Sequence, residues 1–297
     1  MHIEKSHITK GLFALAVCVG AVNSIAIAQD STRTDLPSDL LITSGVEREP
    51  LRPPVVSLTN PSCPLTANQV NAVRAGVGSA FIGGNAYLYH YFKKAWWSGT
   101  RAPHFFFHAD WDQEFRDQDK FGHLLGGYHL ARVGYAGLRE SCVSDKKAIW
   151  WSAAYAAAFQ LQIEIFDGMY KKYGFSYADM IANTAGQALA VAQELNPRLR
   201  AIKPTFSYHK TRALGNTEAG LITSELRPSL DYSGQTYWFS ADMEQLLPDE
   251  VKPYWPSFIR VSAGHSVTDW ISPETGNPQR AKRKILLSLD FDPEKLP

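Results

Sequence analysis

The residues best suited to chemistry are acids, amides and a histidine that lie between positions 119 and 183. In the segment 147–170, Gln160, Glu164 and Asp167 are spaced i, i+4 and i+7, which places all three on one face of a helix. Two acids and an amide are costly to bury without partners, and the rest of this segment is rich in alanine and aromatic residues. Their face therefore either points to water or contributes to a buried polar site.

An acid–histidine pair lies earlier in the chain. Asp119 is followed by Lys120 and, four residues after the acid, by His123. A carboxylate one helical turn before a histidine can orient the imidazole and raise its basicity. Asp119 could equally be an acid that complements the dipole at the start of a helix. The spacing leaves both interpretations open.

A third group begins at Ser176 and Asp179, which have the spacing of a helix capping box. That motif gives Asp179 a complete structural explanation. Asn183 has no such explanation, because it follows one turn later on the same face, with Gly186 and Ala190 beyond it. The small residues of this face would let another helix approach closely.

These groups form one predicted polar cluster. The candidate catalytic residues and candidate metal ligands are His123, Glu164 and Asp167. The other members of the cluster are Asp119, Lys120, Asp179 and Asn183. Such a set can bind a divalent metal ion through carboxylates and imidazole, run acid–base chemistry with shifted pKa values, or form a buried network that fixes helix register. The sequence contains no Cys/His zinc spacing, phosphate-binding glycine loop or nucleophile elbow. We expect the side chains of His123, Glu164 and Asp167 to lie within contact distance.

About four helices must position these residues. We predict a mainly α fold, in which a helical bundle is followed by a small C-terminal antiparallel β element. The predicted helices cover 67–94, 119–140, 147–170 and 176–195, with a shorter connecting piece at 112–117. The predicted strands cover 205–212, 235–241, 258–267 and 285–292. The predicted domains are 63–200, which is helical, and 201–297, which is β-rich.

The first predicted helix is rich in glycine. It contains Gly76, Gly78, Gly83 and Gly84. A glycine inside a helix costs about 1 kcal/mol relative to alanine. We therefore expect this helix to approach the backbone of a neighbour closely.

Residues 1–28 have the features of a signal peptide. Lys5 and Lys10 give a basic start, 11–22 is apolar, and 26–28 is an A-x-A cleavage site. The apolar stretch is too short to span about 30 Å of hydrocarbon, which favours cleavage over a membrane anchor. We predict an exported protein, with an irregular lead-in at 29–62 that is rich in Pro, Ser, Thr and Asp.

The cysteines bear on compartment and anchoring. Lipid attachment would use Cys18, but Val17 stands where a small residue is favoured, so lipidation is not predicted. Removal of the signal peptide leaves Cys63 and Cys142. In an oxidising compartment such a pair can form a disulfide, and we favour this over two separate buried thiols.

Composition limits the partners. The chain has 297 residues, 45% hydrophobic and 20% charged, which is typical of a folded globular protein. Thirty basic residues against 29 acidic ones leave almost no net charge, whereas binding nucleic acid needs a basic surplus. Residues 148–166 have about the length of a membrane span but contain Gln160, Gln162 and Glu164, which are costly to insert. We expect the envelope membrane or envelope proteins as partners, a small-molecule or lipid ligand, and no nucleic acid. Embedding in the inner membrane stays open.

The order of these residues also resembles a known family. The motif residues are His104-Phe105-Phe106-Phe107, Asp110, Asp119-Lys120-Phe121-Gly122-His123, Glu164-x-x-Asp167-Gly168 and Gly174-Phe175-Ser176-x-x-Asp179-x-x-x-Asn183-x-x-Gly186. Over about residues 80 to 195 the chain resembles the YfiM-like family of predicted periplasmic or outer-membrane lipoproteins, whose function is not known. Several of these motifs are also similar to those of VanZ-like membrane proteins, which are linked to glycopeptide resistance. The stretch from Asp231 resembles the C-terminal extension of longer family members.

The resemblance implies an α-helical envelope domain with a shared polar site in the periplasm or at the outer membrane, and it supplies no reaction. We expect an accessory or binding role in the cell envelope. The alternative is a membrane-associated hydrolase or metal-dependent enzyme that acts on a lipid or cell-wall precursor. Clustered carboxylates around a histidine favour the enzyme, and the lack of a recognisable nucleophile or metal motif favours the accessory role.

Overall fold

The computed structural model describes residues 63, 65–113, 115–211, 229, 231–271, 279–292 and 295–296. All of these residues belong to one compact unit of the chain. The predicted signal peptide, Cys18 and the predicted lead-in at 29–62 therefore lie outside the described residues.

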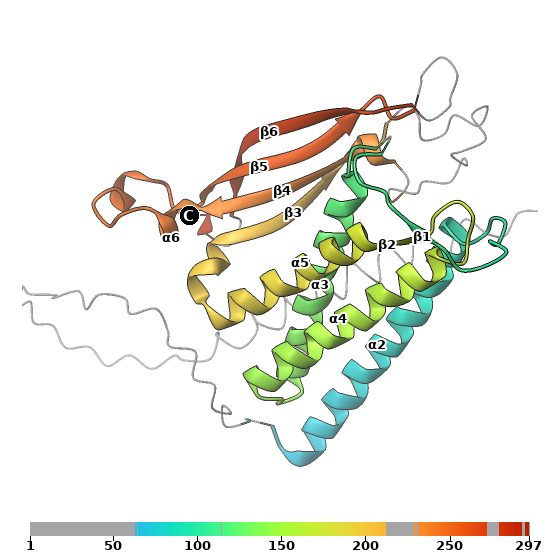
Figure 1. Cartoon of the computed structure of the whole chain (residues 1–297). Helices are drawn as coiled ribbons and strands as arrows, with labels where there is room; N and C mark the ends of the chain where they lie inside the picture. Colours follow the sequence, from blue (N-terminus) through green and yellow to red (C-terminus); the bar gives the residue numbers. More distant parts are fainter. Residues whose placement is uncertain are drawn as a thin grey trace, which may run out of the picture. The chain divides into compact units, whose positions relative to one another are not determined.

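Four long helices form the first part of the described chain. They are α2 (Ala67–Ala95), α3 (Gln118–Glu140), α4 (Asp145–Asp167) and α5 (Tyr177–Leu195). Thr66 and Gln69 form a capping box at the start of α2, and Ser176 caps α5. Figure 1 shows α2, α4 and α5 side by side with α3 behind them, and α3 packs on both α4 and α5. The predicted helical part with a small antiparallel sheet is thus confirmed.

The third predicted helix is too long at its C-terminal end. It was expected to reach Tyr170, but α4 ends at Asp167 because the chain turns back there. The carbonyl oxygen of Asp167 accepts hydrogen bonds from the N–H groups of Tyr170 and Gly174. Gly174 has φ of 98°, a left-handed conformation that favours glycine.

This turn builds a parallel strand pair that the predicted fold lacks. β1 (Phe107–His108) pairs with β2 (Phe175–Ser176) in parallel, so the fold is not purely helices and an antiparallel sheet. Strands of two residues are too short to produce an alternating pattern, and the sequence therefore gave no sign of them. The pair places the segment that ends at Asp110 beside the start of α5.

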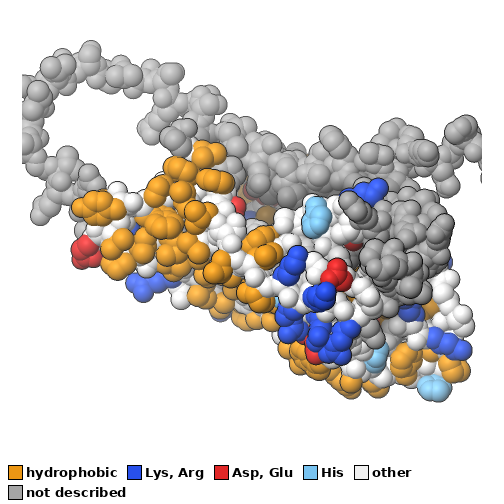
Figure 2. All heavy atoms as spheres, turned by 90° about the horizontal axis from the view of Figure 1, so that it is seen from above, with side chains coloured by type: hydrophobic (Ala, Val, Ile, Leu, Met, Phe, Trp, Pro, Cys, Tyr) orange, Lys and Arg blue, Asp and Glu red, His pale blue; other side chains and the backbone are white. Residues whose placement is uncertain are grey.

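The C-terminal part is a four-stranded antiparallel sheet. Its strands, in spatial order, are β3 (Ile202–Tyr208), β4 (Gln235–Asp242), β5 (Ile259–Thr268) and β6 (Lys282–Phe291). The short helices of this region are η1 (Pro197–Ala201), η4 (Tyr232–Gly234), α6 (Met243–Leu246) and η5 (Lys252–Tyr254). Phe121 of α3 stacks on His265 of β5 with ring centroids 4.3 Å apart, which docks the helices on the sheet. Figure 2 views the molecule from the β6 side and shows hydrophobic side chains gathered next to lysines and arginines.

The close helix approach occurs at a different place from the one predicted. A Cβ on any glycine from Gly76 to Gly84 would meet nothing within 4 Å in the described chain, because α2 lies at the periphery. A Cβ on Gly186 would instead collide with the backbone of Leu124, and one on Gly127 would lie 2.6 Å from the carbonyl oxygen of Asn183. The expectation for the first helix is wrong. The expected close approach along the small-residue face of α5 is confirmed.

A disulfide joins Cys63, just before α2, to Cys142, in the turn between α3 and α4, with Cα atoms 5.6 Å apart. Near it, Arg74 Nε of α2 donates a hydrogen bond to the carbonyl oxygen of Ser141 at 3.3 Å. Within the described part, none of the helices is both long and apolar enough to cross a membrane.

Candidate functional site

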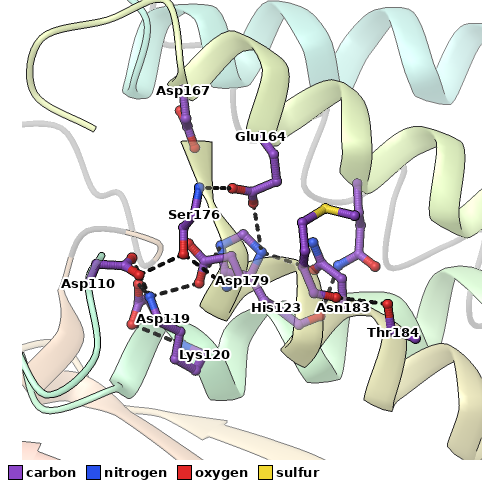
Figure 3. A network of polar contacts seen from close by, with 12 residues as sticks. Asp110, Asp119, Lys120, His123, Glu164, Asp167, Ser176, Asp179, Asn183 and Thr184 are labelled. Atoms are coloured by element: carbon purple, nitrogen blue, oxygen red, sulfur yellow. Dashed lines mark hydrogen bonds and ion pairs between the residues drawn. The ribbon is translucent and has the colours of Figure 1, made fainter. Parts of the chain in front are cut away.

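The polar site lies where α3, α4 and α5 meet (Figure 3). α3 contributes Lys120 and His123, α4 contributes Glu164, and α5 contributes Asp179 and Asn183. The close approach of α3 and α5 at Gly186 draws these side chains together. Glu164 has no exposed surface, so its face does not point to water. Of the two interpretations of this α4 face, exposure to water or a buried polar site, the structure therefore shows the buried site.

One half of the site is organised by a lysine. We call Lys120, Asp110 and Asp119 the lysine half. The Lys120 ammonium lies 2.8 Å from Asp119 Oδ2 and 2.8 Å from Asp179 Oδ1, and it also donates a hydrogen bond to Asp110. Ser176 Oγ donates to the other Asp110 oxygen at 2.6 Å. Each carboxylate of this half therefore faces a cation.

The other half is organised by a histidine. We call His123, Glu164 and Asn183 the histidine half, and Asp179 lies between the two halves. His123 Nδ1 lies 3.0 Å from Asn183 Oδ1, a hydrogen-bond distance. It lies 3.6 Å from Glu164 Oε1, while Nε2 lies 3.7 Å from Asp179 Oδ1. Both of these separations are longer than a hydrogen bond.

Several polar atoms of this site are buried without being satisfied. Glu164 Oε1, Asp179 Oδ1 and Asn183 Nδ2 make no hydrogen bond with any described residue. Asp179 Oδ1 has its ion pair with Lys120, but the pair lacks hydrogen-bond geometry. Leaving a buried polar atom unpaired costs about 1–3 kcal/mol. Buried oxygens of this kind call for a functional explanation.

Burial and charge set the pKa values of the histidine half. Burial raises the pKa of Glu164 to about 8, and the nearby Asp179 and Asp167 add to the increase against the opposing effect of His123. Burial disfavours the charged form of His123, but the carboxylates of Asp179 and Glu164 outweigh it and raise its pKa to about 8. Both groups therefore change protonation near neutral pH.

In the lysine half, burial and neighbouring charges affect the pKa values differently. Burial disfavours the charged Lys120, but Asp119, Asp179 and Asp110 outweigh burial and raise its pKa. Burial alone would raise the pKa of Asp110, yet hydrogen bonds from Lys120 and Ser176 lower it. The pKa of Asp119 is raised to about 6 by burial and by the Asp179 carboxylate. At neutral pH this half holds a charged lysine among charged carboxylates.

Asp167 is held apart from the other two candidate catalytic residues. The structure brings His123 and Glu164 together, while the Asp167 Oδ1 atom accepts a hydrogen bond from Trp97 Nε1 at 2.6 Å. Burial raises the pKa of Asp167 to about 6. A catalytic role of these three residues stays a prediction.

Two local interpretations of the sequence can be compared with the contacts. Asp119 pairs with Lys120 at 2.8 Å, and the hydrogen bond of His123 goes to Asn183, but the Asp119 carboxylate does help to raise the pKa of His123. Ser176 does cap α5, because its Oγ accepts from the Asp179 N–H at 3.0 Å. The Asp179 carboxylate, however, faces Lys120 and His123, so a cap does not explain it completely.

Two members of the site were not among the predicted cluster. Asp110 lies on a loop outside every predicted helix, and helical periodicity therefore could not assign it. Its place in the family motif was the signal that could have found it. Ser176 was interpreted as a cap alone, but its N–H also donates to Glu164 Oε2 at 3.3 Å. Ser176 thus contacts both halves.

Among the described residues, two sets of donors could hold a metal ion. Within each set, the ligand atoms lie within 4.8 Å of one another. One set is Asp110, Asp119 and Asp179, and the ammonium of Lys120 already lies among these carboxylates. The other is His123, Glu164 and Asp179, which contains both carboxylate oxygens that lack a hydrogen bond; of its three donors only Asp179 Oδ1 also faces the Lys120 ammonium, at 2.8 Å. The second set is therefore the better candidate metal site.

Comparison with known proteins shows a similarity to one family over the segment that carries this site. No curated protein and no solved structure gives a significant match to the chain. Residues 112–194, which run from the loop before α3 almost to the end of α5, match the family described as "Predicted periplasmic lipoprotein (DUF2279)". That segment contains His123, Glu164 and Asp179. The match supports an exported protein of the cell envelope, and over these residues the chain is similar to a family of periplasmic lipoproteins whose function is not known.

Proposed function

We propose that this chain is an envelope protein with a binding or accessory role and that it binds a divalent metal ion through His123, Glu164 and Asp179. One observation carries the proposal: three donors from three helices lie within 4.8 Å, and two of them present buried oxygens that accept no hydrogen bond from the described residues. A metal ion would satisfy both oxygens at once. It would also join α3, α4 and α5.

The ratio of carboxyl groups to basic groups in the site supports the binding of a cation. Carboxyl groups outnumber bases here, with Lys120 and His123 as the two bases that face them. The carboxyl groups are Asp110, Asp119, Glu164, Asp167 and Asp179. Once Glu164 and His123 have lost their protons, the histidine half presents the Glu164 carboxylate and the shared Asp179 carboxylate to a cation. Binding would release protons from Glu164 and His123, because both must be deprotonated to act as ligands.

The donor types favour a transition metal. Imidazole suits zinc, iron, copper and nickel, whereas sites for calcium and magnesium use oxygen ligands alone. One nitrogen and two carboxylate oxygens fit Zn²⁺, Mn²⁺ or Fe²⁺ better than Ca²⁺. Asn183 Oδ1 lies 3.0 Å from His123 Nδ1, and this hydrogen bond fixes the orientation of the imidazole ring.

A metal-dependent hydrolase that acts on a lipid or cell-wall precursor is the second candidate. It is favoured by the side chain of His123, which is 19% exposed whereas Glu164 is fully buried. A substrate could therefore reach the imidazole. The similarity to YfiM-like and VanZ-like proteins is compatible with either role. A signal peptide at 1–28 would bring the chain to the compartment that both roles require.

The test is thermal unfolding of chelator-treated protein at pH 8, with Zn²⁺, Mn²⁺ or Ca²⁺ added. At a metal concentration of about 100 Kd the stabilisation is about 2.7 kcal/mol, or about 5–10 °C in Tm. We expect Zn²⁺ or Mn²⁺ to give this shift, and Ca²⁺ to give less. Glu164→Gln should lose the shift, whereas Glu140→Gln, at an exposed position of α3, should keep it. An equal shift in both variants would show that the metal binds elsewhere and would refute the proposal.

A further inference from the structure

The outer faces of α4 and α5 have the opposite polarity from the usual surface helix. Their buried positions carry polar side chains such as Gln160, Glu164 and Asn183 beside apolar ones such as Phe159 and Ile163. The exposed positions of α4 after its first turn are Trp150, Trp151, Ala154, Ala157, Ala158, Leu161 and Ile165, all of them apolar. A surface helix of a globular protein normally turns its apolar stripe inward. On α4 a second apolar stripe points outward.

The apolar surface continues beyond α4. α4 packs beside α5, whose exposed residues include Tyr177, Ile181, Ala185 and Ala188. Tyr177 stacks on Phe107 of β1 with ring centroids 5.3 Å apart, and Phe107 is itself 58% exposed. In Figure 1, α4 and α5 lie in front of α3, so the sides of these helices away from α3 are toward the viewer. A contiguous exposed apolar surface of this kind marks an interaction site.

Basic residues stand at both ends of the apolar stripe. Lys146 and Lys147 are exposed in the first turn of α4, next to Trp150 and Trp151. Lys171 and Lys172 are exposed just after its end. Tryptophan and tyrosine favour the boundary between hydrocarbon and water, and lysines beside an apolar face attract anionic lipid headgroups. This combination is typical of helices that lie in a membrane interface.

We propose that the exposed face of α4 and α5, which we call the α4–α5 face, docks flat on an envelope bilayer that contains anionic phospholipid. The side chains of Trp150, Trp151, Leu161 and Ile165 enter the headgroup and upper acyl region, and the flanking lysines contact lipid phosphates. The polar site lies on the opposite, inner side of the same helices. This docking does not depend on metal binding.

The test measures binding of the full chain to vesicles of phosphatidylcholine alone or with about one third phosphatidylglycerol. Binding should be tighter to the anionic vesicles and should weaken with salt, because exposed charges are screened. The double variant Trp150→Gln/Trp151→Gln should lower the partition constant by at least about tenfold. Tryptophan quenching by lipids brominated in the upper acyl chain should fall in the same variant.

The matched control is Leu287→Gln on β6, because Leu287 is 82% exposed and lies on another apolar surface. It should leave the partition constant within about twofold of the unchanged protein. Lys146→Gln/Lys147→Gln should reduce the preference for anionic vesicles, whereas Lys252→Gln, far along the chain in η5, should not. Circular dichroism of each variant verifies that the fold is kept, and these positions are exposed enough to tolerate the changes.

Three outcomes would overturn the proposal. The first is equal vesicle binding by the unchanged protein and the tryptophan double variant. The second is a loss in Leu287→Gln that matches the loss in the tryptophan variant. The third is concentration-dependent self-association in sedimentation, without vesicles, that the tryptophan variant abolishes, since the occupant of the face would then be a second copy of the chain.

Discussion

The two halves of the polar site are built from the same kinds of residue and behave differently. In the lysine half, Lys120 lies against Asp110, Asp119 and the shared Asp179. In the histidine half, His123 lies 3.6 Å from Glu164, whose Oε1 accepts no hydrogen bond from the described part of the chain. The difference teaches that residue types alone do not decide function. Carboxylates that all face a cation make a structural element, and a buried oxygen without a hydrogen bond leaves capacity for a ligand.

Protonation separates the halves in the same way. Hydrogen bonds from Lys120 and Ser176 hold the pKa of Asp110 below its usual value, so this carboxylate stays charged. Burial raises the pKa of Glu164 to about 8, so this group carries a proton at neutral pH. The lysine half is therefore an ionic network fixed by its own charges. The histidine half can exchange protons for another cation.

The largest effect should come from removing the cation of the lysine half. Lys120→Met leaves Asp110, Asp119 and Asp179 facing one another without their common partner. Breaking a buried ion pair by removing one partner costs about 3–5 kcal/mol. We expect a loss of this size in the free energy of unfolding, measured by urea denaturation in the presence of a chelator.

Lys252→Met is the control for this change, because Lys252 makes a surface ion pair with Asp249. It should alter stability by no more than about 0.5 kcal/mol. If Lys120→Met were as mild as the control, the lysine half would not be a structural element, and the contrast between the halves would be lost.

The second prediction concerns the pH dependence of stability in the histidine half. The pKa of Glu164 is raised from 4.5 to about 8. Between these two pH values the folded protein keeps a proton on Glu164 that the unfolded chain has lost. Stability from this group is complete below pH 4.5 and is lost as the pH rises through about 8. The pKa of His123 is raised from 6.5 to about 8, so its contribution is present below pH 6.5 and is also lost through about 8. Both effects make the protein less stable between pH 5 and pH 8 in chelator.

Each proton contributes a slope of up to about 1.4 kcal/mol per pH unit, and screening and relaxation reduce the total to an expected 1–3 kcal/mol. Glu164→Gln removes one of the two groups, so it should flatten the slope and be more stable than the unchanged protein at pH 8. Glu140→Gln should reproduce the unchanged slope. A profile that rises from pH 5 to pH 8, or a Glu164→Gln profile as steep as the original, would contradict this account.

The contrast also explains which features could be predicted from the sequence. Spacing alone placed Gln160 and Glu164 on one face, and the small residues around Gly186 indicated where two helices meet. Both follow from the fixed number of residues per turn within one helix. The start of α5 followed from its serine cap in the same local way, whereas the end of α4 did not.

Features that depend on tertiary contacts could not be predicted. The role of Asp110 requires the β1–β2 pair, which brings its loop to Lys120 and Ser176. The glycines of α2 were misinterpreted because their number says nothing of whether a neighbour is there. Asp179 fitted a cap by spacing, but the direction of its carboxylate depends on α3. The sequence therefore identified most members of the site, and only the contacts divided them into two halves.

The smallest effect should come from Ser176→Ala, and it tests whether the halves are independent. The change removes the hydroxyl that caps α5 and donates to Asp110, but it keeps the N–H that donates to Glu164 Oε2. Loss of a serine cap costs about 1 kcal/mol. Thr184→Ala is the control, since the Thr184 hydroxyl bonds only within α5 among the described contacts, and it should change stability by less than about 0.5 kcal/mol.

The deciding measurement is the metal-induced shift in Tm of the serine variant. If the lysine half is structural and the histidine half binds the ion, Ser176→Ala lowers stability and leaves the metal shift unchanged, because no proposed ligand is touched. A metal shift that disappears together with the cap would mean that Asp110 and Lys120 hold Asp179 in place for the ion. The site would then be one network, and residue-by-residue division into halves would be wrong.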